Sequence, residues 1–128
     1  LTGEKGHMES AERQLEFMGK TAAAQPSAHG FALLALTEAE YPNGELICVT
    51  AEDEEPTALA DVVSRAGGNL SVLLKTPRNA ETLARVSAFT ADYEIPQSGA
   101  LYYLCRGQSC MKPVANLEEL EDELSLLV

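Results

Sequence analysis

The sequence contains few of the residues that most often carry out chemistry. Its 128 residues include three cysteines, two histidines and no tryptophan. The cysteine count is odd, and the opening LTGEKGHMESAE lacks the apolar core of a secretory signal, which argues against a disulfide framework. We therefore expect a cytoplasmic protein. The histidines, His7 and His29, form no recognisable Ser-His-Asp or Cys-His order, so no catalytic set is predicted.

Positive charge and long apolar runs are also scarce. Lys and Arg number 9 against 20 Asp and Glu, which gives a formal net charge of −11. Nucleic acids and anionic membranes attract basic surfaces, so we expect neither as a partner. The longest strongly apolar run, FALLAL at residues 31–36, is far shorter than the ~20 residues that a membrane span needs.

Phosphate loops and metal-ligand clusters are missing as well. The stretch TAEDEEPT (50–57) follows the first expected strand and is acidic, whereas a dinucleotide site needs glycines that let the backbone approach the phosphates. Zinc sites usually combine a C-x2-C pair with a second ligand pair, and this chain offers the C-x4-C pair Cys105 and Cys110 alone. We predict no cofactor and no metal.

Two helices are predicted in the N-terminal third of the chain. Residues 8–24 place apolar side chains at three- and four-residue steps, and Gln25-Pro26 ends that helix. Ser27 can cap a second helix over residues 28–40, which carries FALLAL and is apolar on nearly every side. Such a helix requires neighbours on more than one side.

After Gly44 the pattern changes to short apolar runs that alternate with helical segments. The runs ELICVTA (45–51), LSVLLKT (70–76) and ALYYLC (100–105) barely alternate, as in parallel strands that are buried on both faces. Helical signals separate and follow them: Pro56 in a first turn, Gly67-Gly68 as a stop, Asn79 as a cap, and a capping box at Asn116 and Glu119.

This order predicts the fold class and the domain boundary. The class is α/β, with two N-terminal helices followed by a small three-stranded parallel sheet (βαβαβα) in strand order 2-1-3. Residues 1–43 would form a helical pair and residues 44–128 a small α/β domain. A cleft is expected at the carboxyl ends of the strands, between residues 50–52 and Leu104-Cys105, with the cysteine pair at its edge.

The stretch YYLCRGQSCMKPV (102–114) is the one candidate for chemistry. A redox dithiol needs a thiolate, and the last expected helix begins six residues after Cys110, beyond the reach of its dipole. A disulfide is possible because Gly107 allows a tight turn between Cys105 and Cys110. Two small buried residues that pack a strand end and the next turn are a third interpretation, and the residues alone leave all three open.

The same stretch carries a resemblance to a known family. ALYYLCRGQSCMKPVANLEELEDEL (100–124) resembles the C-terminal end of the spermatogenesis-associated thioredoxin-like family, large proteins with a thioredoxin-like N-terminal domain. LTGEKGHMESAERQLEFM (1–18) and QPSAHGFALLAL (25–36) are similar to helices of the family's central six-hairpin α-toroid, and YPNGELICVT (41–50) is similar to the entry of its small α/β end domain. The resemblance implies a C-terminal fragment, in which residues 1–43 are the end of the toroid.

Two functions follow as expectations. The first is a non-catalytic structural and interaction domain, whose partners are the α-toroid and thioredoxin-like domain of its own chain, in a protein of undefined activity. Its N-terminal helices would also allow the fragment to self-associate. The alternative is a redox accessory module, in which Cys105 and Cys110 exchange with the thioredoxin-like domain. We expect no enzymatic activity from this chain alone.

Overall fold

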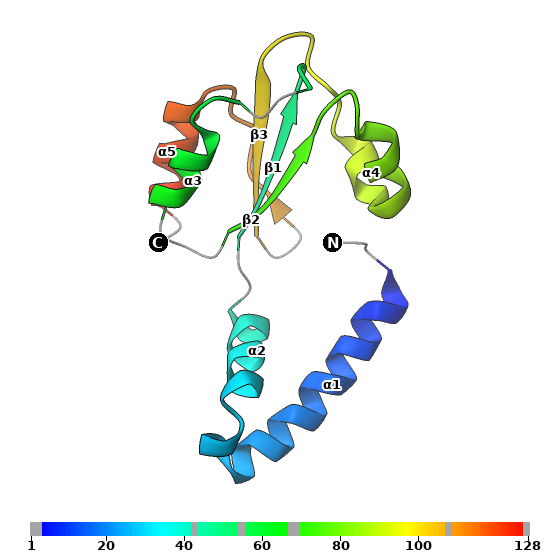
Figure 1. Ribbon diagram of the computed structural model, residues 1–128, viewed down its shortest axis with the longest axis vertical. Helices are drawn as coiled ribbons and strands as arrows, with labels where there is room; N and C mark the ends of the chain where they lie inside the picture. Colours follow the sequence, from blue (N-terminus) through cyan, green and yellow to red (C-terminus); the bar gives the residue numbers. More distant parts are fainter. Residues whose placement is uncertain (1–3, 42–43, 54–55, 67–69, 107–108, 127–128) are drawn as a thin grey trace. The chain divides into compact units, whose positions relative to one another are not determined.

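A computed structural model describes residues 4–41, 44–53, 56–66, 70–106 and 109–126. The chain divides into two compact units, Leu1–Pro42 and Asn43–Val128, each of which is described by itself. The first unit is helical, and the second contains helices and a sheet (Figure 1).

The first unit is a helical hairpin. Helix α1 spans Lys5–Ala24, a 3-10 turn η1 spans Pro26–Ala28, and helix α2 spans Gly30–Glu40. The helices approach closely at Gly19, where an added Cβ would lie 3.8 Å from the Leu36 side chain. Both helices were predicted, but the cap was not Ser27. Pro26 starts the 3-10 turn, which takes up Ser27 and leaves His29 at the start of α2.

The second unit is built on a four-stranded mixed sheet. Its strands are β1 (Gly44–Thr50), β2 (Leu70–Lys75), β3 (Ala100–Arg106) and the two-residue β4 (Ser109–Cys110), in the order β2-β1-β3-β4. Helices α3 (Leu59–Arg65) and α5 (Leu117–Ser125) lie on one side of the sheet and α4 (Ala80–Val86) on the other (Figure 1). The α/β class is thus confirmed.

The prediction of a three-stranded parallel sheet is wrong. Strands β1 and β2 are parallel, but β3 runs antiparallel to β1, with Thr50 opposite Ala100 and Glu45 opposite Cys105. The cause is the segment 87–99, which connects α4 to β3. It contains a 3-10 helix, η2 (Ala88–Asp92), and packs Phe89, Tyr93 and Ile95 on the sheet. The chain therefore returns to the end of the sheet from which β2 leaves it.

The predicted helix signals have mixed outcomes. The Asn116 side chain accepts a hydrogen bond from the Glu119 N–H at 2.8 Å, which confirms Asn116 as the cap of α5. Asn79 stands at the start of α4, but its side-chain oxygen accepts from the Thr76 N–H instead of capping the helix. Pro56 precedes the first turn of α3 and does not lie in it. Gly67-Gly68 lies outside the described residues.

Strand β1 supplies both hydrophobic clusters of this unit. Leu46 and Cys48 point into the cluster under α3 and α5, whereas Ile47 and Val49 point into the cluster under η2. All four side chains are 0–2% exposed. Strand β3 alternates in the same way, so Tyr102 lies on the α3 and α5 side and Cys105 on the η2 side. Burial, followed by the nearby Cys48 thiol, raises the pKa of Tyr102 to about 12.

A buried lysine fixes the end of η2 to the sheet. Lys75, the last residue of β2, is 5% exposed, and its Nζ donates to the carbonyl oxygens of Thr90 and Tyr93, each at 2.6 Å. The ammonium group supplies a charged donor to two carbonyls at the end of a 3-10 helix, where the Thr90 carbonyl also accepts from the Tyr93 N–H at 3.4 Å. It thereby holds the backbone of Tyr93 against the sheet.

We predict that Lys75→Met lowers the free energy of unfolding of this unit by about 2–4 kcal/mol, because two carbonyls lose a charged donor while the apolar stem is retained. The measurement is urea unfolding followed by tyrosine fluorescence, since three of the four tyrosines lie in this unit. The exposed Lys112→Met is the control and should change stability by less than about 0.5 kcal/mol. Equal effects of the two substitutions would contradict the role given to Lys75.

Candidate functional site

The candidate site is the hairpin formed by β3 and β4. Cys105 and Cys110 lie directly opposite each other in its ladder and form a disulfide, with their Cα atoms 3.9 Å apart. The Met111 N–H donates to the Leu104 carbonyl at 2.8 Å, so the cysteines occupy a pair without hydrogen bonds of its own. At such a pair the side chains of antiparallel strands approach most closely. The register of the hairpin therefore brings the sulfurs together.

An extra residue beyond the disulfide ends the regular ladder. Tyr102 and Val114 exchange both backbone hydrogen bonds, at 2.9 and 3.0 Å. The chain thus advances three residues from Met111 to Val114 while β3 advances two from Leu104 to Tyr102, which leaves one extra residue after Met111. Pro113 lies in this bulge, where the missing N–H of proline is no loss.

The two sulfurs have different surroundings. Cys105 is 4% exposed and belongs to the cluster of Ile47 and Val49, whereas Cys110 is exposed at the edge of the sheet. The interpretation of both cysteines as buried packing residues therefore does not hold for Cys110. Of the three interpretations, the disulfide is the one that the structure contains.

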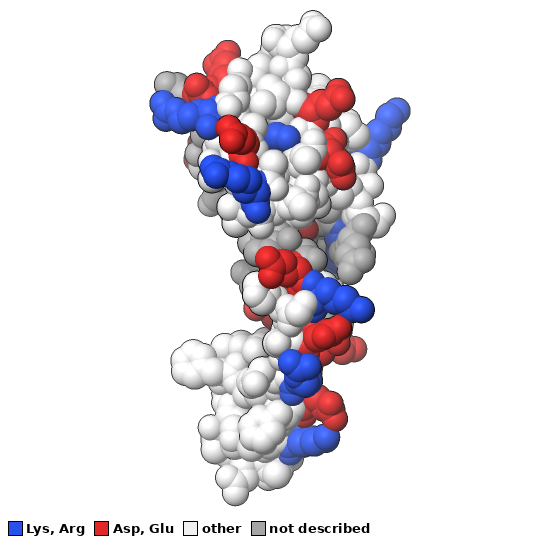
Figure 2. All heavy atoms as spheres, turned by 90° about the vertical axis from the view of Figure 1, so that its right-hand side faces the viewer, with Lys and Arg blue, Asp and Glu red and all other residues white. Residues whose placement is uncertain are grey.

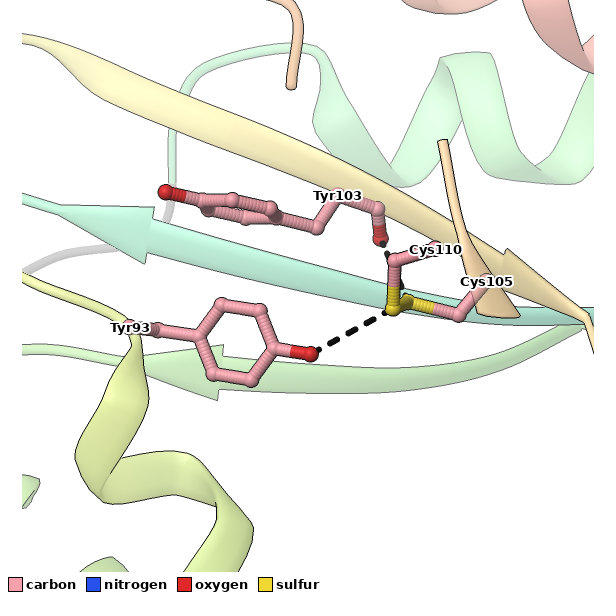
Figure 3. Close-up of a disulfide and its surroundings, with 4 residues drawn as sticks. All are labelled: Tyr93, Tyr103, Cys105 and Cys110. Carbon is pink, nitrogen blue, oxygen red and sulfur yellow. Dashed lines mark hydrogen bonds between the residues drawn. A yellow bond between two sulfur atoms is a disulfide. The ribbon is translucent and has the colours of Figure 1, made fainter. Parts of the chain in front are cut away.

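A tyrosine hydroxyl lies within hydrogen-bonding distance of the sulfur of the exposed cysteine, Cys110. The Oη atom of Tyr93 lies 3.4 Å from Cys110 Sγ, within hydrogen-bonding distance for a sulfur acceptor (Figure 3). The Tyr93 ring packs edge-on against Tyr103 with centroids 4.7 Å apart, and Phe89 packs against its other side at 6.3 Å. Burial, and after it the neighbouring Tyr103, Glu45 and Asp92, raises the pKa of Tyr93, so the hydroxyl keeps its proton at neutral pH.

The site does not border the cleft that the sequence analysis expected. That cleft was placed beside residues 50–52, at the carboxyl end of β1. Because β3 is antiparallel, Cys105 pairs with Glu45 at the other end of β1, and Thr50 pairs with Ala100. The disulfide and residues 50–52 thus lie at opposite ends of the sheet.

Within the α/β unit, the third cysteine is not brought to the disulfide. Cys48 is buried in β1 and belongs to the cluster on the opposite face of the sheet. His7 and His29 lie in the helical unit, where the His29 Nδ1 is 2.8 Å from the Gln25 carbonyl oxygen. Among the described residues there is no group of three or more potential metal ligands, and no helix long and apolar enough to span a membrane.

Sequence reasoning missed Tyr93 and Lys75. Both lie outside the cysteine stretch, and neither stands in a recognised motif. A signal was present in Phe89, Tyr93 and Ile95, whose apolar side chains suit a covering segment better than an open loop.

No protein-family model, curated protein or solved structure matches this chain.

We predict that the disulfide stabilises the α/β unit by about 2 kcal/mol, the value expected for so short a closed loop. Reductant should lower the urea midpoint of the wild-type chain, and Cys105→Ala/Cys110→Ala should remove this sensitivity. Cys48→Ala is the matched control, because it removes a buried thiol outside the disulfide. It should lower stability and keep the sensitivity to reductant. A wild-type midpoint that reductant leaves unchanged would contradict the prediction.

Proposed function

We propose that this chain is a non-catalytic structural and interaction domain, the C-terminal part of a larger thioredoxin-like protein. The observation that carries the proposal is helix α2, which is mostly apolar and has no buried residue. Phe31 is 91% exposed and Leu34 is 66% exposed, one turn apart on the same face of the helix. Clustered apolar side chains of this kind mark surfaces that contact another protein segment.

The charges of the helical unit support the same interpretation. In Figure 2 the charged side chains of this unit gather along one strip of the surface, and most of the remaining surface in that view carries none. Ion pairs such as Lys20 to Glu16, at 2.7 Å, lie on α1. We propose that the uncharged side packs against further helices of the α-toroid in its own chain, as the resemblance of residues 1–36 suggests.

The first helix of the α/β unit carries no redox motif at its start. The unit is a βαβ arrangement followed by an antiparallel hairpin and a last helix, in the order β2-β1-β3-β4. Thioredoxin-like redox sites carry C-x2-C near such a βαβ pattern, with the attacking sulfur at a helix N-terminus. Residues 51–58, which precede α3, contain no cysteine. The missing cysteines support a non-catalytic role.

We predict that the isolated chain self-associates through α2, because a second copy can cover the same apolar face. Sedimentation equilibrium should show a concentration-dependent dimer. Phe31→Ser/Leu34→Ser should weaken it by at least about a hundredfold, since two large side chains lose their burial. Val86→Ser is the control: Val86 is 57% exposed on α4 of the other unit, and its replacement should leave the dimer intact. A wild-type chain that is monomeric at every concentration would contradict the proposal.

We also propose an alternative, a redox accessory module that uses Cys105 and Cys110. The observation that favours it is the disulfide with one exposed sulfur. Disulfides of proteins in a reducing cytoplasm, the compartment we expect, usually take part in exchange or sensing.

This alternative predicts reversible oxidation of the pair. In glutathione buffers of graded composition, alkylation and mass spectrometry should detect both the dithiol and the disulfide within the range of cytoplasmic potentials. A pair that stays in one state across the whole range would exclude the alternative and leave the structural function unaffected.

A further inference from the structure

We propose that the reduced pair donates electrons to accessible disulfides of other molecules. Cys110 is the sulfur that forms the mixed disulfide with the outside molecule. Cys105 then resolves that mixed disulfide. This inference rests on the redox alternative above and adds the roles of the two sulfurs, the direction of electron flow and the assistance of Tyr93.

The roles follow from access. A thiolate and a disulfide react along the axis of the breaking bond, so the attacked sulfur needs an open approach. Cys110 lies in the edge strand and is exposed, whereas Cys105 is 4% exposed within a hydrophobic cluster. An outside disulfide can therefore reach Cys110 in the folded chain and cannot reach Cys105.

Tyr93 supplies the polar group that a reactive thiolate needs. Its hydroxyl lies 3.4 Å from Cys110 Sγ and can donate to the thiolate of the reduced chain (Figure 3). A hydrogen bond to a charged acceptor is stronger than one to a neutral acceptor, so it favours the reactive form. The Lys75 Nζ atom donates to the backbone carbonyl of Tyr93 at 2.6 Å, which fixes the position of the backbone that carries the tyrosine ring. Tyr93 is thus a positioning and stabilising residue for Cys110.

The reaction balances with a disulfide as the sole co-reactant. The Cys110 thiolate attacks one sulfur of RSSR, the S–S bond of RSSR breaks, and one RS⁻ leaves. Cys105 then attacks Cys110 Sγ, expels the second RS⁻ and closes the protein disulfide. Two electrons pass from the cysteines to RSSR, and the two thiol protons end on two RSH molecules.

The register of the hairpin favours this direction. Cys105 and Cys110 stand opposite each other in the ladder, so the resolving step needs little further ordering. The apolar cluster around Cys105 disfavours its thiolate in closure and in opening alike, so burial slows both steps and favours neither. Because the two sulfurs are already held together, closure of the protein disulfide competes well with its opening by an outside thiol.

The experiment uses the reduced full chain and Ellman's reagent, an aromatic disulfide whose released thiolate is coloured. The wild-type chain should release two thiolates and end with the Cys105–Cys110 disulfide. Cys105→Ser should release one and retain the mixed disulfide on Cys110, located by peptide mass spectrometry. Cys110→Ser should react only after denaturation. Tyr93→Phe should slow the first step about tenfold, the loss expected for one hydrogen bond to a charged group.

Tyr102→Phe is the matched control, because it removes the same hydroxyl from the opposite face of the sheet. It should leave the first step unchanged. Trapping on Cys105 of the folded Cys110→Ser chain, or equal rates for Tyr93→Phe and Tyr102→Phe, would overturn the assignment of roles while redox exchange itself stood. If neither Cys105 nor Cys110 reacts with Ellman's reagent in the folded wild-type chain, the redox alternative is overturned together with this inference.

Discussion

The α/β unit depends on the burial of strand β1 on both faces. Leu46 and Cys48 lie in one hydrophobic cluster, and Ile47 and Val49 lie in the other, so this central strand contacts the layers on both faces of the sheet. It also provides both backbone ladders, with β2 on one side and β3 on the other. Because its four central side chains, at residues 46–49, alternate between the two clusters, a slip of one residue would exchange the contents of the two cores. The register of β3, and with it the position of Cys105, is set by this constraint.

Much of this arrangement could be predicted from local patterns. The apolar run ELICV indicated a doubly buried strand, and Asn116 with Glu119 indicated where α5 begins. The direction of β3 could not be predicted in this way, because it depends on which end of the sheet the preceding connection reaches. Segment 87–99 has no helical period, yet Phe89, Tyr93 and Ile95 cover a sheet face together. The order of β2, β1 and β3 was correctly predicted even though β3 runs the other way.

Because the direction of β3 was predicted wrongly, the cysteine pair was expected at the wrong end of the sheet. At the carboxyl end of β1, the polar groups of the described loops bond to one another. The Asp53 carboxylate accepts from the Arg78 N–H at 2.8 Å, and the Ala51 N–H donates to the Gly99 carbonyl at 2.9 Å. The exposed sulfur lies at the other end of the sheet. Sequence spacing identified Cys105 and Cys110 as a pair, but Tyr93 could be joined to them only by the folded chain, because 17 residues separate it from Cys110.

The disulfide is placed so that a change in its redox state affects the edge of the sheet more than its core. Reduction leaves Cys105 as a neutral thiol, which behaves as a small apolar side chain and remains compatible with the cluster of Ile47 and Val49. Cys110, in contrast, belongs to a strand of two residues at the edge of the sheet, next to β3 in the order of the described strands. Without the covalent link, that strand is held by the short ladder before the bulge at Pro113, which is weak because edge strands of this length bury little. The backbone ladders that join β1 to β2 and to β3 do not depend on the S–S bond, so they are retained in both redox states. An exchange reaction at Cys110 can therefore proceed on a sheet whose core stays folded.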